Sequence, residues 1–371
     1  MNAHAGANVT SISDSTHEAP LSREALESYL RQEDPEALEA LWAKADGVRR
    51  RNVGDAVYLR GLIEISNHCA RQCHYCGIRS GNTAVHRYRM SRSEVLDCAK
   101  QARDLGYGTV VLQAGEDAAL TCDWVAGVVR QIKDATGLAV TLSLGERADD
   151  ELKAWKDAGA DRYLMRFETS NPDLFALIHP PRSGSFVDRV ELLRRLRLMG
   201  YEVGSGALIG IPGQSYGDLA RDIELFHELQ LDMIGVGPFI AHPRTPLGQR
   251  PFPQNADQVP NTEEMTYKVL ALTRLMRPDA NLPSTTALAT LNLSTGRELG
   301  LQRGANILMP NLTPTQYRAL YEIYPAKACI RETAKQCHAC VAMRLLSIGR
   351  HIGQGAGSSP SFGKRNETAV G

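Results

Sequence analysis

Short apolar runs alternate with amphipathic helical patterns along most of the chain from about residue 60 onward. The runs have the length of buried strands, and the stretches between them have apolar residues every three or four positions, as on one face of a helix. The runs lie at 62–65, 109–113, 140–144, 162–166, 203–209, 233–236, 282–286 and 307–309. Strands alternating with helices predict the α/β class, and eight such repeats predict a (β/α)8 barrel of the TIM type.

The clearest intervening helix begins at Ser91, because Ser91-x-x-Glu94 is a capping box. Its buried face is expected to be formed by Val95, Cys98, Ala99 and Ala102.

The barrel is flanked by further segments at both ends of the chain. The expected organisation is a disordered tail (1–20), N-terminal helices that pack on the barrel (21–57), the barrel (58–312), a C-terminal segment with a second cysteine site (313–352) and a flexible, Gly- and Ser-rich tail (353–371). Ser22 is placed to cap the first N-terminal helix, and Pro35 opens the second.

The composition is that of an ordinary globular protein. The chain has 371 residues, 43% hydrophobic and 23% charged, which is enough for one barrel with extensions. Lys+Arg and Asp+Glu are both 42, and this balance predicts neither a nucleic-acid nor an acidic-membrane surface. We expect a cytoplasmic protein, because no apolar run has the length of a membrane span and the N-terminus shows no apolar signal segment.

The most distinctive chemistry follows the first predicted strand, where Cys69, Cys73 and Cys76 have the spacing C-x3-C-x2-C. Three thiolates on one short loop suit a [4Fe-4S] cube, which takes one cysteine per iron and here keeps one open iron. An open iron is a position where a substrate or cofactor binds. The loop is expected at the C-terminal ends of the barrel strands, where barrel enzymes have their active sites.

Two other interpretations of this loop are less favoured. A zinc site needs a fourth ligand such as His68 or His74, but zinc sites are usually built from two ligand pairs. Disulfides need an oxidising compartment, for which the sequence shows no signal segment.

Further polar residues follow the other predicted strands. After the second strand, Gly115 lets the backbone approach a ligand closely, and the Glu116 carboxylate accepts hydrogen bonds from an ammonium group. Arg162, Arg166 and Glu168 share one face of the fourth strand, and buried arginines need an anionic partner. That partner is either an anionic ligand in the barrel mouth or a structural carboxylate.

The last strands end in small and polar residues. The glycine-rich segment 204–214 permits a flat adenine to lie against backbone, although such a segment is otherwise simply a turn. Thr285, Thr286 and Met309 supply hydroxyls and a thioether for a cavity that holds a small polar ligand.

A second cysteine set, Cys329, Cys337 and Cys340, lies near the C-terminus. Its spacing allows an iron–sulfur cluster or a zinc site, and we favour a second cluster. Cys98 is most simply a core residue, and Cys122 has no cysteine neighbour in the sequence.

Taken in order, these segments resemble one family, the radical S-adenosylmethionine (SAM) maturases of [FeFe]-hydrogenase of the HydE type. Tyr75, just before the last cysteine of the loop, matches the signature of the radical SAM superfamily. The resemblance covers about residues 44–364 and rests on 69–79, 87–90, 111–117, 141–146, 159–164, 235–239, 242–243, 306–311 and 317–318. The spacing of Cys329, Cys337 and Cys340 also resembles the second cluster site of that family.

The resemblance implies a radical enzyme that cleaves SAM reductively. SAM would chelate the open iron of the [4Fe-4S] cluster, and one electron from a donor would release a 5′-deoxyadenosyl radical. The residues implied to hold SAM are Tyr75, Glu116, Glu168, Arg189 and Tyr321.

It also implies a role in assembling the two-iron subcluster of the hydrogenase. The substrate would be a small anionic iron complex with cysteine, carbon monoxide and cyanide, made by a partner maturase, and the radical would act at its sulfur. The residues implied to line its cavity are Gln113, Thr141, Arg162, Thr285, Thr286 and Met309.

Three alternatives are less favoured. Methylornithine synthase, a mutase, resembles the overall pattern but is not expected to have the second cysteine set. Biotin synthase, a sulfur-inserting enzyme, would need a cysteine where Ser143 stands. A non-enzymatic iron–sulfur carrier leaves the polar residues at the barrel mouth unexplained.

Overall fold

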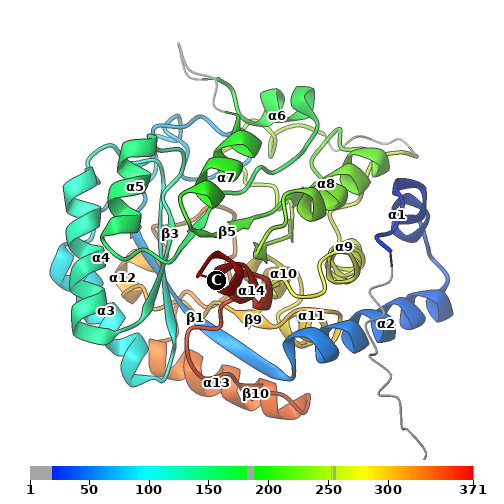
Figure 1. Ribbon diagram of the computed structural model, residues 1–371. Coiled ribbons are helices and arrows are strands. Elements are labelled where there is room, and N and C mark those ends of the chain that lie inside the picture. Colours follow the sequence, from blue (N-terminus) through cyan, green and yellow to red (C-terminus); the bar gives the residue numbers. More distant parts are fainter. Residues whose placement is uncertain (1–18, 182–187, 252, 254–255, 371) are drawn as a thin grey trace, which may run out of the picture.

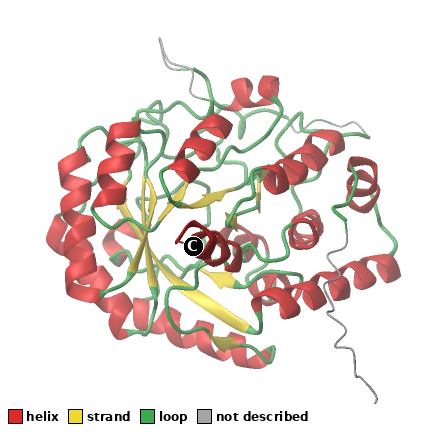
Figure 2. Ribbon diagram, viewed as in Figure 1, coloured by secondary structure: helices red, strands yellow, loops and turns green. Residues whose placement is uncertain are grey.

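The computed structural model of the chain describes residues 19–181, 188–251, 253 and 256–370. A barrel of parallel strands lies at its centre, surrounded by helices (Figures 1 and 2). The expected tail 1–20 falls outside the described residues except for its last two positions. In the part of the chain that is described, no helix is long and apolar enough to cross a membrane.

The barrel strands are β1 (Ala56–Ser66), β2 (Thr109–Ala114), β3 (Ala139–Ser143), β4 (Arg162–Leu164), β5 (Glu202–Ser205), β7 (Met233–Ile234) and β9 (Ile307–Leu308). They pair in parallel in the order β9-β1-β2-β3-β4-β5-β7. Two isolated parallel bridges, Met233 with Asn281 and Pro283 with Ile307, close the remaining gap. Residues 281–283 therefore take the eighth position, and the predicted (β/α)8 barrel is confirmed.

The strands are apolar because both of their faces are covered. On β2, Val110 and Leu112 are fully buried and Val111 is 1% exposed on the opposite face. Alternate residues of each strand thus fill the barrel or pack under the helices.

The longer helices of the surrounding ring are α3 (Arg92–Asp104), α4 (Cys122–Thr136), α5 (Asp149–Asp157), α7 (Arg189–Leu198), α8 (Tyr216–Glu228) and α9 (Glu263–Met276). The shorter elements are α6 (Pro172–Ile178), α10 (Thr286–Leu291), α11 (Gly296–Gln302), α12 (Thr315–Arg318) and the two-stranded sheet of β6 (Leu208–Ile209) and β8 (Gly237–Pro238). The predicted capping box of Ser91 and Glu94 begins α3, and the predicted face of that helix is buried.

Two N-terminal helices, α1 (Arg23–Leu30) and α2 (Pro35–Val53), pack against the barrel's outer helices α8 and α9. The Ser22 side chain accepts a hydrogen bond from the backbone of Ala25, as predicted, and Asp34 caps α2 in the same way.

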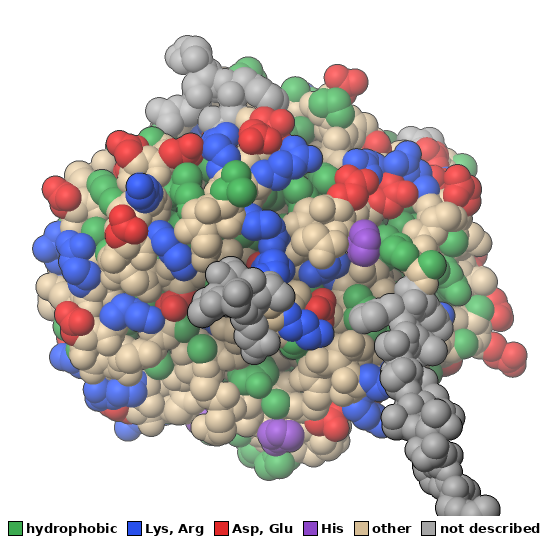
Figure 3. Space-filling model, viewed as in Figure 1, with side chains coloured by type: hydrophobic (Ala, Val, Ile, Leu, Met, Phe, Trp, Pro, Cys, Tyr) green, Lys and Arg blue, Asp and Glu red, His purple; other side chains and the backbone are tan. Residues whose placement is uncertain are grey.

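The C-terminal part consists of α13 (Ala334–Ser347), β10 (His351–Ile352) and α14 (Pro360–Val370). Figure 1 looks onto the N-terminal ends of the strands, and α14 crosses the centre of this view. On this face, positive and negative side chains are interspersed (Figure 3).

The segment between β10 and α14 differs from the flexible tail that its composition predicts. Ser359 is 1% exposed, and its backbone N–H donates to Glu202 at 2.9 Å. A Cβ on Gly108, at the start of β2, would meet the carbonyl oxygen of Gly355 at 1.7 Å. Glycine and serine here serve close packing, because the segment lies directly against the strand ends.

Candidate active site

The cysteine loop leaves β1 at the C-terminal end of the barrel and is held by side chains from neighbouring segments. The Asn67 amide donates to the carbonyl oxygens of His86 (2.8 Å) and Leu320 (2.7 Å). The Arg87 guanidinium donates to the carbonyl oxygen of Ile78 at 2.7 Å. These bonds fix the loop backbone from both sides.

The three thiols of the loop are partly shielded from solvent and lie close enough to raise one another's pKa. Burial raises the pKa of Cys76 to about 12, and burial together with Cys76 and Cys69 raises that of Cys73. The backbone N–H of Arg71 donates to the Cys69 sulfur at 3.4 Å. Clustered sulfurs that receive backbone N–H bonds fit an iron–sulfur cluster, whose thiolates are stabilised in this way.

The end of β2 lies directly against this loop. A Cβ on Gly115 would meet the carbonyl oxygen of His68 at 2.3 Å, so only glycine fits. The next residue, Glu116, accepts a hydrogen bond from the backbone of Glu146 at 3.1 Å. Burial and the nearby Glu146 carboxylate raise the pKa of Glu116. The predicted SAM-binding carboxylate therefore lies beside the cysteine loop.

Tyr75 and Glu168 meet across the barrel mouth. The Tyr75 hydroxyl donates to Glu168 Oε1 at 3.1 Å, and Arg166 forms an ion pair with Glu168 Oε2 at 3.0 Å. Glu168 has a φ of 67°, in the left-handed region that side chains rarely adopt. Strain of this kind persists where the surroundings fix the residue, and it concentrates at functional sites.

Arg189, the first residue of α7, belongs to the same group. Its Nε donates to Glu146 Oε1 at 2.9 Å. Beside it lies His179, whose Nδ1 is 3.2 Å from the Cys73 sulfur and whose Nε2 is 3.0 Å from the Tyr75 hydroxyl. Burial and Arg189 lower the pKa of His179, which keeps the imidazole neutral. The sequence analysis missed His179, because a single histidine in a loop has no spacing to distinguish it.

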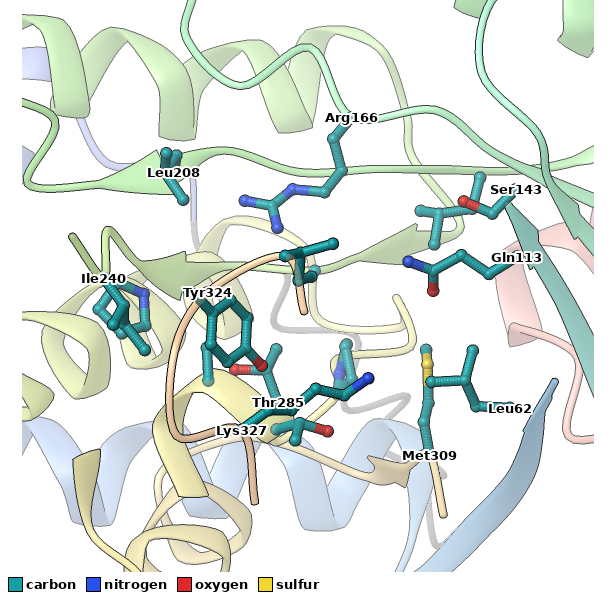
Figure 4. A pocket seen from close by; sticks show the side chains of 18 of the residues that line it. Leu62, Gln113, Ser143, Arg166, Leu208, Ile240, Thr285, Met309, Tyr324 and Lys327 are labelled. Carbon is teal, nitrogen blue, oxygen red and sulfur yellow. The ribbon is translucent and has the colours of Figure 1, made fainter. Parts of the chain in front are cut away.

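A cavity of about 220 Å³ opens inside the barrel next to Tyr75 (Figure 4). Most of its wall is apolar. Four of the residues predicted to line it do so: Gln113, Thr285, Thr286 and Met309. The charged side chains of the lining are Glu64, Arg166 and Lys327. The sequence analysis considered Arg166 for the barrel mouth but did not consider Glu64 or Lys327.

The prediction that Arg162 lines this cavity is wrong. Its guanidinium lies at the opposite end of the barrel, where it pairs with Glu202 at 2.5 Å and donates to Thr109 (3.0 Å) and Ser358 (2.8 Å). Arg162 is the first residue of β4, so its position along the strand puts it at the N-terminal end. The structural carboxylate considered above is its partner.

Thr141 also lies outside the cavity lining, one inward-facing position below Ser143 on β3. It is 1% exposed, and its hydroxyl has no hydrogen-bond partner among the described residues.

The C-terminal segment covers one side of the cavity. Tyr321, predicted to hold SAM, is 2% exposed and hydrogen-bonds the side chain of Gln113. The Lys327 ammonium lies 5.3 Å from the centre of the Tyr321 ring and forms an ion pair with Glu64. Tyr321 thus lies beside both the neutral and the charged parts of the cavity wall.

The second cysteine set combines thiols with arginines. A hydrogen bond from Cys337 lowers the pKa of Cys329, and Arg297 donates to the Cys329 sulfur at 3.1 Å. Cys340 hydrogen-bonds Arg344. Nowhere in the described part of the chain are three or more His, Cys, Asp or Glu side chains placed to hold a single metal ion.

Comparisons with known proteins agree with this geometry. Residues 63–226 match the model of the radical SAM superfamily. The chain is 43% identical over 333 residues to the [FeFe] hydrogenase maturase subunit HydE of Thermotoga maritima, covering 90% of this chain and 92% of the relative. It is 28% identical over 290 residues to 3-methylornithine synthase of Methanosarcina acetivorans, covering 78% of this chain and 79% of the relative. A crystal structure of methylornithine synthase superposes with a TM-score of 0.76 at 24% identity, covering 95% of this chain and 97% of that one.

A three-cysteine loop at the mouth of a parallel barrel, within a radical SAM match, defines the class: the protein is a radical SAM enzyme. The similarity of nearly the whole chain to one maturase is more specific. The chain belongs to the family of the [FeFe] hydrogenase maturase subunit HydE.

Proposed function

We propose that the protein acts in the maturation of [FeFe]-hydrogenase by radical chemistry on a cysteine-ligated iron carbonyl and cyanide complex. The observation that supports this most is the charged and hydroxyl-bearing wall of a cavity that also includes Tyr75 of the cysteine loop. Arg166 and Lys327 present two cationic groups to the cavity, each ion-paired with one carboxylate (Glu168 and Glu64), and such cations can contact a small anionic ligand.

The cluster would be held by Cys69, Cys73 and Cys76, and together with SAM it would supply a 5′-deoxyadenosyl radical upon one-electron reduction. Around this position the protein presents carboxylates for an ammonium group, at Glu116 and Glu168. Arg189 offers a guanidinium for the carboxylate of SAM. Tyr321 is buried and Tyr75 is half-buried, and both shield the reacting centre from water.

The cavity residues would bind and orient the substrate. Gln113, Thr285 and Thr286 offer an amide and two hydroxyls as hydrogen-bond partners, and Met309 offers a soft sulfur next to a metal complex. Gln113 lies on β2, Thr285 and Thr286 begin α10, and Met309 follows β9. Their positions on different elements would hold the ligand from several directions, which is how a barrel mouth orients a substrate.

The remaining features complete the proposal. A second iron–sulfur cluster would lie at Cys329, Cys337 and Cys340, with Arg297 and Arg344 balancing the thiolate charge. The partners would be a maturase that supplies the iron complex and a protein that donates one electron, all in the cytoplasm.

Deleting the gene tests this function. Cells without the protein are expected to make [FeFe]-hydrogenase that lacks activity, and a plasmid copy should restore hydrogen evolution, whereas a Cys73→Ala copy should not. Full hydrogenase activity in the deletion strain would contradict the proposal and would favour a mutase like methylornithine synthase, whose fold this chain shares.

A further inference from the structure

One ion pair faces the cavity from the side opposite to Arg166. Glu64 comes from β1 and is 1% exposed, and Lys327 comes from the C-terminal segment and is 8% exposed. Both line a cavity whose other walls are mainly apolar, and Figure 4 shows the Lys327 and Arg166 side chains entering it. A charged pair in such surroundings costs desolvation energy that an apolar pair of similar size would not.

The pair is not needed to hold the C-terminal segment in place. Arg318, from the same segment, donates to the carbonyl oxygens of Thr313 (2.5 Å) and Asn311 (2.8 Å). Tyr317 stacks on Tyr88 with ring centres 4.5 Å apart. The segment is thus anchored outside the cavity, which leaves the ion pair available for a ligand.

Both members of the pair keep unused hydrogen-bonding capacity. An ammonium has three donors, and Lys327 uses them only on Glu64 and, at 3.5 Å, on the carbonyl oxygen of Tyr321 among the described residues. The Glu64 carboxylate accepts from Lys327 and from Asn311 at 3.0 Å, although its two oxygens offer about four acceptor sites.

Building on the proposed function, we propose that Glu64 and Lys327 form the subsite for the free amino-acid head of the substrate. The ligand's carboxylate lies against Lys327 and its ammonium group against Glu64, so that four charges alternate in sign. Because Glu64 and Lys327 together are neutral, a head group with only one of these charges brings a net charge into the mainly apolar cavity, which is unfavourable. Arg166 is ion-paired with Glu168 on the opposite side of the cavity, and its Nε, which has no hydrogen-bond partner among the described residues, is left for a negatively charged part of the ligand.

The experiment uses three small probes with the reconstituted holoenzyme in the presence of SAM, which would fill the open position of the cluster. The probes are S-methyl-L-cysteine, its decarboxylated analogue 2-(methylthio)ethylamine and its deaminated analogue 3-(methylthio)propanoate. Their blocked sulfur cannot bind the cluster as a thiolate. Calorimetry is expected to show S-methyl-L-cysteine binding about tenfold or more tightly than either analogue.

Two variants should each remove one of these two differences in affinity. In Lys327→Met the advantage over the decarboxylated analogue should disappear, and in Glu64→Gln the advantage over the deaminated analogue should disappear. Lys327→Arg keeps the charge and should retain most of the selectivity. If Lys327→Met does not fold, as judged by thermal melting and SAM affinity, Lys327→Gln replaces it.

Lys268→Met is the matched control, because Lys268 is 3% exposed and ion-paired with Glu264 outside the cavity. It should leave the ranking of the probes unchanged. Equal affinities for all three probes, failure of S-methyl-L-cysteine to bind the folded holoenzyme, or the same loss in Lys268→Met would overturn the proposal. Hydrogenase maturation is measured separately, so a failed subsite and a failed function give different results.

Discussion

The two ends of the barrel contain the same kinds of residues but use them differently. At the N-terminal end, Arg162 and Glu202 neutralise each other and the segment around Ser359 covers them. At the C-terminal end, Arg166 and Lys327 border a cavity, and three thiols lie beside it. Charged side chains therefore pair under a covering segment at one end and line a cavity at the other, and residue type alone does not distinguish the two.

The N-terminal end is sealed by main-chain and side-chain bonds together. Arg60 donates to the carbonyl oxygen of Gly357 at 3.0 Å, and Asn281 donates to the same oxygen at 2.9 Å. The fully buried Asp232 carboxylate accepts a hydrogen bond from the Ser361 hydroxyl at 3.2 Å. The segment around Ser359 thus satisfies polar groups that the strand ends would otherwise leave unpaired.

The largest effect is expected from the thiols at the open end. Replacing any one of Cys69, Cys73 or Cys76 by alanine removes a cluster ligand and should abolish SAM cleavage, with iron and sulfide content falling sharply. Cys122→Ser, half-buried at the start of α4, is the control and should keep its iron. A fully loaded, active Cys73→Ala protein would show that the loop does not hold the cluster.

At the closed end, Arg162→Met should cost stability. Removing one partner of a buried pair leaves Glu202 uncompensated, which typically costs about 3–5 kcal/mol. Denaturant unfolding of the variant measures this. SAM affinity should change little, because the residues proposed to bind SAM lie at the other end of the barrel. Wild-type stability together with weakened substrate binding would instead indicate that Arg162 lines the cavity.

Asp222, buried behind the mouth, is expected to make stability depend on pH. It accepts bonds from the backbone of Ser170 (2.5 Å) and from Gln214 (3.2 Å), and burial raises its pKa to about 7 from 3.8. The folded state therefore binds a proton on the Asp222 carboxyl more tightly than the unfolded state does. The stability that this protonation contributes is fully present below about pH 4 and is lost as the pH rises to about 7.

Comparing wild type with Asp222→Asn isolates this effect. The unfolding free energy of wild type relative to the variant should fall by up to about 1.4 kcal/mol per pH unit within that window. Parallel stability curves from pH 4 to 7 would mean that Asp222 is ionised in the folded protein.

The smallest effect is expected at Gly115. An added methyl group would press on the backbone of His68, and such overpacking typically costs about 1–3 kcal/mol. We expect Gly115→Ala to weaken SAM binding about tenfold, measured by equilibrium dialysis. Gly47→Ala on α2, where the nearest atom would be 3.5 Å away, should leave SAM binding at the wild-type value.

The sequence predicts the barrel well because its signal is repeated. Each strand is an apolar run covered on both faces, and Ser91, Ser22 and Pro35 mark helix starts by local capping chemistry. The cysteine loop is equally clear because its spacing is a local property. Gln113 and Met309 follow from their positions at strand ends.

The wrong predictions share one physical cause. The position of a side chain along the barrel axis depends on how the strands pair with their neighbours, and the local sequence does not determine it. Arg162 and Arg166 share a face and differ only in which end of the barrel they reach, and this depends on the register of β4 with its neighbours. Lys327 reaches the cavity through a segment without periodicity. Glycine and serine at 353–359 suit a loose tail and a closely packed one equally well.

The account depends most directly on radical chemistry at the open end of the barrel. Anaerobically reconstituted protein, reduced by one electron in the presence of SAM, can be analysed for products by chromatography. We predict 5′-deoxyadenosine and methionine in equal amounts. Intact SAM in a sample whose spectrum shows a complete and reduced [4Fe-4S] cluster would contradict the account.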